Sequence, residues 1–246
     1  MRKGSVCFQP PHTGDSMAGI FKRVEKKYYI TERQSEILLA RLGERICPDA
    51  YGEYTISNIY FDTPGNDLIR TSLEKPPYKE KLRLRAYHTP APEDMVYLEM
   101  KKKWQGVVYK RRVELPYQAA EDYTAGGAYP EAFDCQILRE IDHMLRYYHL
   151  QPCVFLAYDR KAYMLKENEE IRFTMDRHIR SRRERLHLGD GDAGTLLDPR
   201  ERCLLEIKAP IALPLWFAEI LAELRIFSTS FSKYGKVYQA GLAAGI

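Results

Sequence analysis

The feature that most constrains the fold is a set of charged residues spaced two apart, which recurs in separate segments of the chain. The residues between the charges are often apolar, such as Leu82, Leu84 and Ile207. Because side chains two apart point to the same face of a β-strand, each segment predicts a strand with one charged and one apolar face. The segments are Glu25-x-Lys27, Lys81-x-Arg83-x-Arg85, Glu99-x-Lys101, Lys110-x-Arg112 and Glu206-x-Lys208.

One charged strand face is ordinary, because solvent commonly covers one face of an antiparallel sheet. Several such faces in one sheet would gather their cations on a single surface. A surface with that much positive charge calls for a polyanion, and the glutamates between the cations indicate a divalent metal bound with it.

Composition indicates one compact domain with locally concentrated positive charge. The chain has 246 residues, 45% of them hydrophobic, and a net charge of only +4. We expect a loose leader at 1–20 and a single domain at 21–246. The 5 cysteines form no CxxC pair, which favours reduced thiols in a cytoplasmic protein over a disulfide framework or a zinc site. No apolar run approaches the ~20 residues of a membrane span.

Alternation and turn residues predict many antiparallel strands and few helices. Thr31 and Gln34 have the spacing of a capping box, and Gln105-Gly106 separates two strands as in a hairpin. A curved or barrel-like sheet with helices on its apolar outside would place the charges in its interior. Unpaired buried cations are costly, so that interior must be wet and able to hold anions. We expect strands at 21–30, 55–62, 79–88, 96–103, 107–115, 154–164, 171–176 and 203–208, and helices after Thr31, at 66–73, from Pro130 and at 214–224.

Other motifs favour ordinary structure over a separate function. The GxGxxG pattern at 189–194 follows an arginine-rich stretch instead of a strand, and its aspartates would repel a pyrophosphate, so we interpret it as a surface turn. The basic run Asp176–Leu188 is interpreted as a solvated hairpin that could also attract a polyanion near the mouth of the charged interior, and no nucleic-acid partner is expected. Neither a P-loop nor a histidine metal motif is present in the sequence.

Further segments, taken in order, carry a family resemblance. They are RVEKKYYI (Arg23–Ile30), SNIYFD (Ser57–Asp62), KLRLRAY (Lys81–Tyr87), YLEMKKK (Tyr97–Lys103), VYKRRVEL (Val108–Leu115), AYDRKAY (Ala157–Tyr163), IRFTMD (Ile171–Asp176), LLEIK (Leu204–Lys208) and FSKYGK (Phe231–Lys236). From about Phe21 to about Tyr238 the chain resembles the VTC domain of the vacuolar transporter chaperone polyphosphate polymerases, within the CYTH-like triphosphate tunnel metalloenzymes.

The resemblance implies an α+β fold: an eight-stranded antiparallel β-tunnel with helices packed outside. Such a tunnel binds a nucleoside triphosphate or a polyphosphate chain together with Mn²⁺ or Mg²⁺. Glu206 matches the metal-binding glutamate of the family, and Glu99 and Glu25 are weaker metal candidates. Strand parity adds Arg172 and Tyr158 to the phosphate contacts. The residues that match phosphate-binding positions are Lys27, Arg83, Arg85, Lys101, Lys110, Arg112, Arg160 and Lys233. Within these sets we expect Arg83, Arg85, Lys110, Arg160 and Glu206 to be catalytic.

The implied activity is an ATP:polyphosphate phosphotransferase that lengthens inorganic polyphosphate inside the tunnel. Two alternatives stay open. The same residues would serve a hydrolase that cleaves tripolyphosphate or a nucleoside triphosphate, and a non-catalytic module would only bind polyphosphate or inositol polyphosphate. The expected small-molecule partners are ATP, polyphosphate and tripolyphosphate. Export of the product would require a separate membrane partner.

Overall fold

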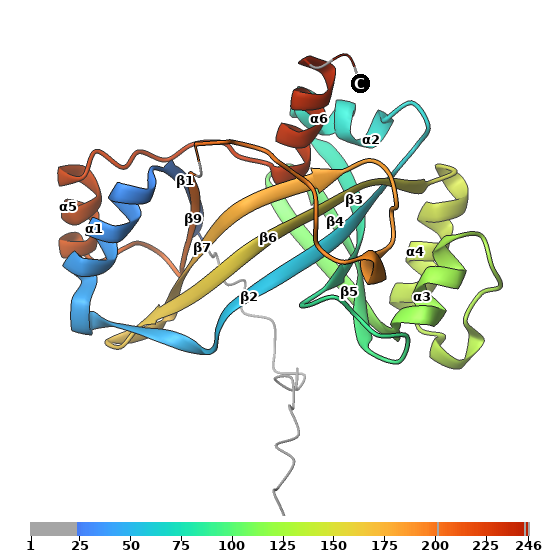
Figure 1. The fold of residues 1–246 in the computed structure, drawn as a ribbon, viewed down its shortest axis with the longest axis horizontal. Coiled ribbons are helices and arrows are strands. Elements are labelled where there is room, and N and C mark those ends of the chain that lie inside the picture. Colours follow the sequence, from blue (N-terminus) through green and yellow to red (C-terminus); the bar gives the residue numbers. More distant parts are fainter. Residues whose placement is uncertain (1–23, 201, 244, 246) are drawn as a thin grey trace, which may run out of the picture.

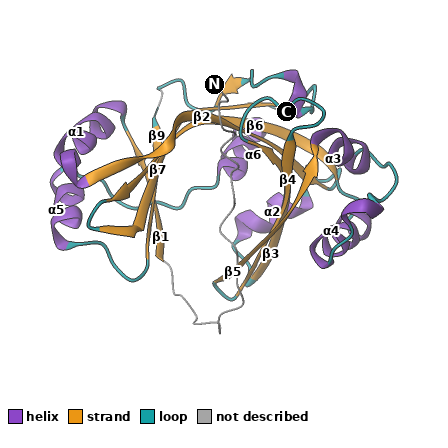
Figure 2. Ribbon diagram, turned by 90° about the horizontal axis from the view of Figure 1, so that it is seen from below, coloured by secondary structure: helices purple, strands orange, loops and turns teal. Residues whose placement is uncertain are grey.

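The computed structural model describes residues 24–200, 202–243 and 245, so the expected leader lies outside the described residues. The strands form one antiparallel sheet with an eight-strand path in the order β1-β9-β7-β6-β2-β3-β4-β5, and the short β8 pairs with β7. Their bounds are β1 Val24–Ile30, β2 Ile46–Asp62, β3 Tyr78–Ala86, β4 Met95–Trp104, β5 Val107–Pro116, β6 Gln151–Leu165, β7 Asn168–Arg182, β8 Thr195–Leu196 and β9 Cys203–Ala209. Figure 2 shows this sheet curving into an arch, with β1 and β5 at its two ends.

The helices lie mostly on the convex side of the arch. Helices α1 and α5 cover the β1–β9–β7 side, and α3 and α4 cover β3, β4 and β5 (Figure 1). This confirms the expected antiparallel sheet with outer helices. The helices are α1 Glu32–Leu42, α2 Asp67–Glu74, α3 Tyr117–Thr124, α4 Gln136–Tyr147, α5 Leu215–Glu223 and α6 Lys233–Ala243.

Alternation along the strands separates an outer apolar core from an inner charged face. On β3, Leu82 and Leu84 are fully buried and belong to the core beneath α3 and α4. Arg83 and Arg85 have the opposite parity and point to the inner face. The same rule places Tyr28 and Ile30 of β1 in the core beneath α1 and α5.

Helix α6, with α2 beside it, packs on the inner side of the arch. Its residues Tyr234 and Val237 share a buried cluster with Tyr60 of β2 and Leu156 of β6. In Figure 2, α6 lies within the curve of the sheet. This position brings the beginning of the helix to the charged inner face.

Asp62, at the end of β2, holds α2 and α6 in place. Its carboxylate accepts hydrogen bonds from the amides of Leu68 (2.9 Å) and Ile69 (3.0 Å) in the first turn of α2. Asn66, the residue before α2, makes no capping bond with its side chain, so Asp62 satisfies these amides instead. The same carboxylate accepts a bond of 2.9 Å from the hydroxyl of Tyr234 in α6.

Some local predictions are confirmed. Thr31 and Gln34 form the capping box that begins α1. Gln105 and Gly106 both have positive φ, 45° and 90°, in the tight turn between β4 and β5. The glycine-rich stretch after Leu188 is a loop with a single 3₁₀ turn, as expected. Cys47, Cys135, Cys153 and Cys203 are free thiols, and Cys7 lies outside the described residues.

Other local predictions were wrong in extent. The helix expected from Pro130 begins at Gln136, because a separate 3₁₀ turn comes first and the Cys135 sulfur then accepts the Leu138 amide at 3.5 Å. Helix α3 was not predicted. The strands β2 and β7 are longer than expected, since each continues through a β-bulge where it pairs with β6.

The prediction that Asp176–Leu188 forms a solvated hairpin was also wrong. Much of the run belongs to β7, and its arginines have structural partners. Arg180 forms ion pairs with Asp159 (3.0 Å) and Asp192 (2.5 Å). The Arg182 guanidinium lies 3.5 Å from the ring centroid of Phe155 and donates to backbone carbonyls of the following loop. These arginines therefore hold the loop on the sheet.

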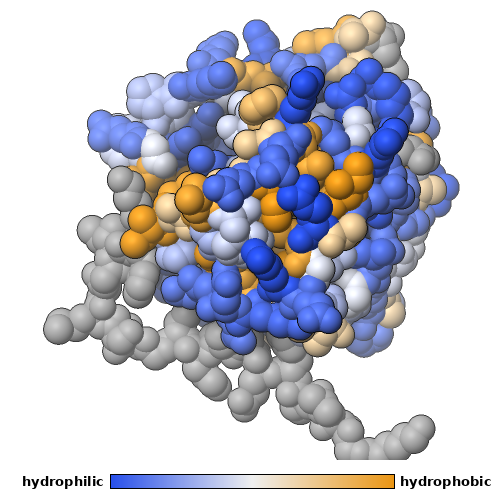
Figure 3. Space-filling model, turned by 90° about the vertical axis from the view of Figure 1, so that its left-hand side faces the viewer, coloured by the Kyte–Doolittle hydropathy of each residue, from blue (hydrophilic) through white to orange (hydrophobic). Residues whose placement is uncertain are grey.

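The surface over α1 and α5 is largely hydrophilic, with separate apolar patches (Figure 3). Among the described residues, the helices are all too short or too polar to cross a membrane.

Candidate functional site

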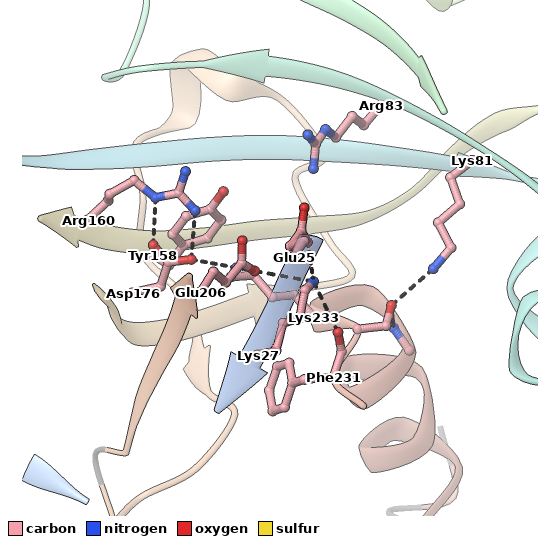
Figure 4. A network of polar contacts seen from close by, with 12 residues as sticks. Glu25, Lys27, Lys81, Arg83, Tyr158, Arg160, Asp176, Glu206, Phe231 and Lys233 are labelled. Atoms are coloured by element: carbon pink, nitrogen blue, oxygen red, sulfur yellow. Dashed lines mark hydrogen bonds and ion pairs between the residues drawn. The ribbon is translucent and has the colours of Figure 1, made fainter. Parts of the chain in front are cut away.

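Glu206 is the centre of a charged cluster on the β1–β9 side of the inner face. Strand pairing puts Lys27 directly opposite Glu206. The Lys27 ammonium lies 3.3 Å from a Glu206 carboxylate oxygen and 3.6 Å from Glu25. Lys233, the first residue of α6, also lies 3.3 Å from Glu206 (Figure 4). Although burial opposes ionisation, the ammonium groups hold the pKa of Glu206 well below its usual range.

Asp176 on β7 extends this cluster and is fully buried. It accepts two hydrogen bonds from the Arg160 guanidinium, at 2.6 and 2.8 Å, and its other contact is the Lys233 ammonium at 2.5 Å. Lys233 therefore bridges the carboxylates of Asp176 and Glu206, and these ion pairs raise its pKa despite burial. The Lys233 ammonium lies 4.3 Å from the ring centroid of Tyr158, which provides a cation–π contact.

Glu99 is the centre of a second cluster, on β3, β4 and β5. Its side chain is only 2% exposed and contacts three cations. Arg83 donates two hydrogen bonds to one carboxylate oxygen (2.8 and 2.6 Å), Lys110 lies 3.0 Å from the other oxygen, and Arg85 lies at 3.8 Å. Burial alone would raise the pKa of Glu99, but these cations lower it to about 2.

Neutral side chains connect the two clusters. Arg83 donates to the Tyr60 hydroxyl at 3.1 Å, and Arg85 donates to the Asn58 amide oxygen at 3.0 Å and to the Tyr158 hydroxyl at 3.3 Å. The surrounding cations lower the pKa of Tyr60 to about 8, although its burial acts in the opposite direction. Sequence reasoning missed Asn58 and Tyr60, which share one strand parity within the Ser57–Asp62 segment.

A row of lysines continues the inner face beyond Arg83, toward α6. Strand pairing puts Lys81 opposite Lys101, and Lys101 opposite Lys110. Burial, together with the neighbouring cations, lowers the pKa of Lys81 to about 8 and also lowers that of Lys101. The Lys81 ammonium donates to the Ser232 hydroxyl at 3.0 Å, just before α6. The start of α6 thus contacts both walls of the arch.

Arg112 and Arg172 also have inner-face parity, since strand pairing puts Arg112 opposite Glu99 and Arg172 opposite Lys208, but among the described residues neither forms an ion pair with the two carboxylate clusters. Both are exposed. The Arg112 guanidinium lies 4.7 Å from the ring centroid of Tyr97, and Arg172 donates to the carbonyl of Glu169 at 3.0 Å. The other predicted residues lie within the two clusters or in the lysine row on the same inner face, namely Lys27, Arg83, Arg85, Glu99, Lys101, Lys110, Tyr158, Arg160, Glu206 and Lys233.

The carboxylates are suited to share a divalent metal with a ligand, not to enclose it. Among the described residues no group of three or more histidine, cysteine, aspartate or glutamate side chains could hold a metal by itself. Mg²⁺ sites commonly use one or two carboxylates, completed by phosphate oxygens and water. Glu206, with Asp176 beside it across Lys233, fits that donor set. Glu99 fits less well, because it contacts three cations, against two for Glu206.

Comparisons with known proteins agree with the fold and the sequence pattern. A family model described as the VTC domain matches residues 22–241. A Hippeastrum protein, described as an adenylyl cyclase with a dominant triphosphatase activity, superimposes with a TM-score of 0.54 and 16% identity, over 89% of this chain and 96% of that one. At this identity the likeness shows the fold alone.

Two further structures resemble the chain less closely. They are an adenylate cyclase-like protein from Vibrio parahaemolyticus (TM-score 0.45, 11% identity, 88% of this chain and 97% of that one) and a protein from Pyrococcus horikoshii (0.45, 14%, 89% and 98%). No match was found among curated proteins.

Proposed function

The chain belongs to the VTC domain family, and we propose that it is a polyphosphate polymerase that transfers the γ-phosphoryl group of ATP to a growing polyphosphate chain. The family match and the fold support an enzyme that handles triphosphates or polyphosphates. The choice of polymerisation rests on the inner face of the arch.

The observation that carries the proposal is the row of lysines beyond the Arg83–Glu99 pair, in which Lys110 contacts Glu99, while among the described residues Lys81 and Lys101 have no carboxylate within ion-pair distance. Lys81, Lys101 and Lys110 face one another on adjacent strands, and Lys79 lies opposite Lys103. Like charges directly opposite one another destabilise a sheet unless an anion lies between them. The triphosphate of a nucleotide needs only the arginine clusters, so the lysines provide contacts for a longer chain of phosphates.

The proposed roles follow from the geometry of each cation. Arg83, Arg85 and Arg160 present planar forks suited to two oxygens of one phosphate, while Lys27, Lys110 and Lys233 supply point charges. Each of these cations already contacts a buried carboxylate, which fixes its position before the ligand arrives. Phosphate oxygens then take the remaining donors of these groups.

In the transfer step, a terminal oxygen of polyphosphate forms a bond to the γ-phosphorus as the bond from that phosphorus to the β,γ-bridging oxygen breaks. ADP leaves with the bridging oxygen. Positioning and neutralisation of charge account for most catalysis of this kind, and the arginines are placed to stabilise the charge on the transferring group. A divalent metal held by Glu206 would neutralise further negative charge on the phosphate oxygens.

Hydrolysis is the main alternative, since the Hippeastrum protein of the same fold has a dominant triphosphatase activity. The same cations would then hold the triphosphate, and water would replace the polyphosphate acceptor. A module that only binds polyphosphate is the other alternative. The buried Glu206 argues against it, because a module that only binds polyphosphate could dispense with a metal ligand, whereas Glu206 with Asp176 offers the carboxylates that a divalent metal uses.

Product analysis tests the proposal. The purified protein is incubated with ATP and either Mn²⁺ or Mg²⁺, and ADP, free phosphate and long-chain polyphosphate are resolved. The proposal expects ADP together with long-chain polyphosphate. ADP with an equal amount of free phosphate would identify a hydrolase, and binding without turnover under both metals would identify a binding module.

A further inference from the structure

A group of tyrosines lies on the inner face near the end of β3 that is farther from α6. Tyr54 on β2, Tyr87 just after β3 and Tyr97 on β4 form edge and tilted ring contacts, with centroids 6.1 Å apart for Tyr54 and Tyr87 and 5.6 Å for Tyr87 and Tyr97. Tyr51 extends the group, 6.1 Å from Tyr54. Tyr87 is 38% exposed and Tyr51 is 60% exposed, so the group presents aromatic surface to solvent.

This tyrosine group is continuous with the phosphate-binding cations. Strand pairing puts Tyr97 directly opposite Arg85, and Tyr54 directly opposite Arg160. Tyr87 follows Arg85 by two residues, on the same face. Along β3 the inner face therefore changes from lysine at Lys81, through arginine, to aromatic at Tyr87.

The order of these side chains matches a ligand with a polyanionic tail and a flat aromatic head. Four residues of strand, from Arg83 to Tyr87, span roughly 13 Å, which is comparable to an extended nucleoside triphosphate. Aromatic side chains bind bases by stacking, and an arginine nearby adds a cation–π contact. The Arg112 guanidinium, beside the Tyr97 ring, is available for such a contact.

We propose that the tyrosine group, with Tyr87 at its centre, is the subsite for the base of the nucleotide. The inference rests on the proposed function, because it takes a nucleoside triphosphate as the phosphoryl donor. The base stacks on the tyrosines near the far end of β3, away from α6. The triphosphate extends from there along the inner face to Arg85, Arg83 and Arg160. The polyphosphate acceptor consequently occupies the lysine row at the α6 end.

The test compares a ligand that has a base with one that has none. Dissociation constants for a non-hydrolysable ATP analogue and for tripolyphosphate are measured by calorimetry on the full chain and on Tyr87→Ala. We expect Tyr87→Ala to weaken binding of the ATP analogue about tenfold or more, the loss typical of one base-stacking aromatic, and to change tripolyphosphate binding less than about twofold. Tyr87→Phe keeps the ring and should bind both ligands as the wild type does.

Two control variants locate the effect. Tyr109→Ala removes an exposed tyrosine from the opposite face of β5 and should change neither constant. Tyr29→Ala alters a separate cavity of about 730 Å³, which Tyr29 and Phe231 help to line. A selective loss of ATP binding in Tyr29→Ala instead of Tyr87→Ala would overturn the inference.

The inference and the proposed function fail in distinguishable ways. Unchanged ATP binding in Tyr87→Ala, or equal losses for ATP and tripolyphosphate, would overturn the base subsite while the phosphate site stands. A wild-type protein that binds neither ligand would overturn both. Tripolyphosphate binding also reports a folded inner face. If Tyr87→Ala loses both ligands and its circular dichroism spectrum shows that it is unfolded, Tyr97→Ala, which removes a neighbouring ring of the same group, is measured in the same way, and equal affinities of that variant and the wild type for the ATP analogue would overturn the subsite.

Discussion

Buried carboxylates on the inner face are outnumbered by the cations that contact them. Glu99 contacts Arg83, Arg85 and Lys110, and Asp176 contacts Arg160 and Lys233. The carboxylates offset only part of the repulsion among these cations, but they fix the cations in position. A polyphosphate can supply the missing negative charge without a large rearrangement of the arginines.

Replacement of Glu206 tests its part in the reaction. Glu206→Gln keeps the size of the side chain, and Lys233 keeps its contact with Asp176, so the fold should survive with a small change in melting temperature. Turnover of ATP should fall by about two orders of magnitude or more, because the variant loses the anionic ligand for the metal. Activity measured across a titration of Mn²⁺ checks this. Full turnover at saturating Mn²⁺ would exclude Glu206 from the metal site.

Lys81 provides a prediction about pH. Its pKa is about 8 in the folded protein, below the usual lysine value of 10.5. Between these values the unfolded chain holds the proton that the empty folded protein has lost, so Lys81 makes the empty protein more stable as pH rises through this range. The same loss of charge weakens binding of a polyanion. The increase in melting temperature caused by tripolyphosphate should therefore be smaller at pH 9 than at pH 7.

The variant Lys81→Arg serves as the control, because arginine stays charged throughout this range. Its response to tripolyphosphate should depend less on pH than that of the wild type. An identical pH dependence in both proteins would show that Lys81 does not titrate in contact with the ligand.

The sequence predicted the inner-face residues better than their partners. Strand parity alone directs Arg83, Arg85 and Lys101 to one face, since that direction depends only on the local period of two. The contacts of Arg85 with Tyr158, which was predicted, and with Asn58, which was missed, depend on the register between strands far apart in the sequence. No local pattern specifies that register, so these contacts could be found only from the fold.

At the scale of elements, the long strand β7 has two different functions along its length. Its first half contributes Asp176 to the inner face, and its second half uses arginines to hold the loop after Arg182. A basic run has the same sequence pattern whether its side chains are exposed to solvent or form ion pairs and hydrogen bonds within the protein. The end of β7 was therefore predicted too early, and the structural role of its arginines was missed.

The difference between these arginines can be measured. Arg182→Ala should lower the free energy of unfolding by about 2 kcal/mol, because it removes a guanidinium that packs on Phe155 and satisfies several carbonyls. Its affinity for tripolyphosphate should be unchanged. Arg83→Ala should reduce that affinity at least tenfold, and Arg33→Ala, at an exposed position of α1, should change neither quantity.

Urea denaturation and calorimetry provide the two values for each variant. If Arg182→Ala and Arg83→Ala lose affinity equally, the basic run near Arg182 takes part in binding and the division of β7 proposed here is incorrect.

At the scale of the whole molecule, the arch collects cations from β1, β3, β4, β5, β6 and α6 on one inner surface. This arrangement destabilises the ligand-free protein, because its cations repel one another. A ligand that binds only the folded state stabilises it by mass action, by roughly 2.7 kcal/mol at a hundredfold excess over its dissociation constant. The inner face should therefore be most stable when a polyanion spans it.

The most direct test of this account is the melting temperature of the wild-type protein as a function of phosphate chain length, at constant ionic strength. We predict an increase of several degrees with tripolyphosphate, a larger increase with longer polyphosphate that reaches the lysine row, and a smaller one with sulfate, which cannot span successive strands. If sulfate, tripolyphosphate and long polyphosphate stabilise the protein equally, the charged strand faces do not form one binding surface for a phosphate chain, and the central claim is contradicted.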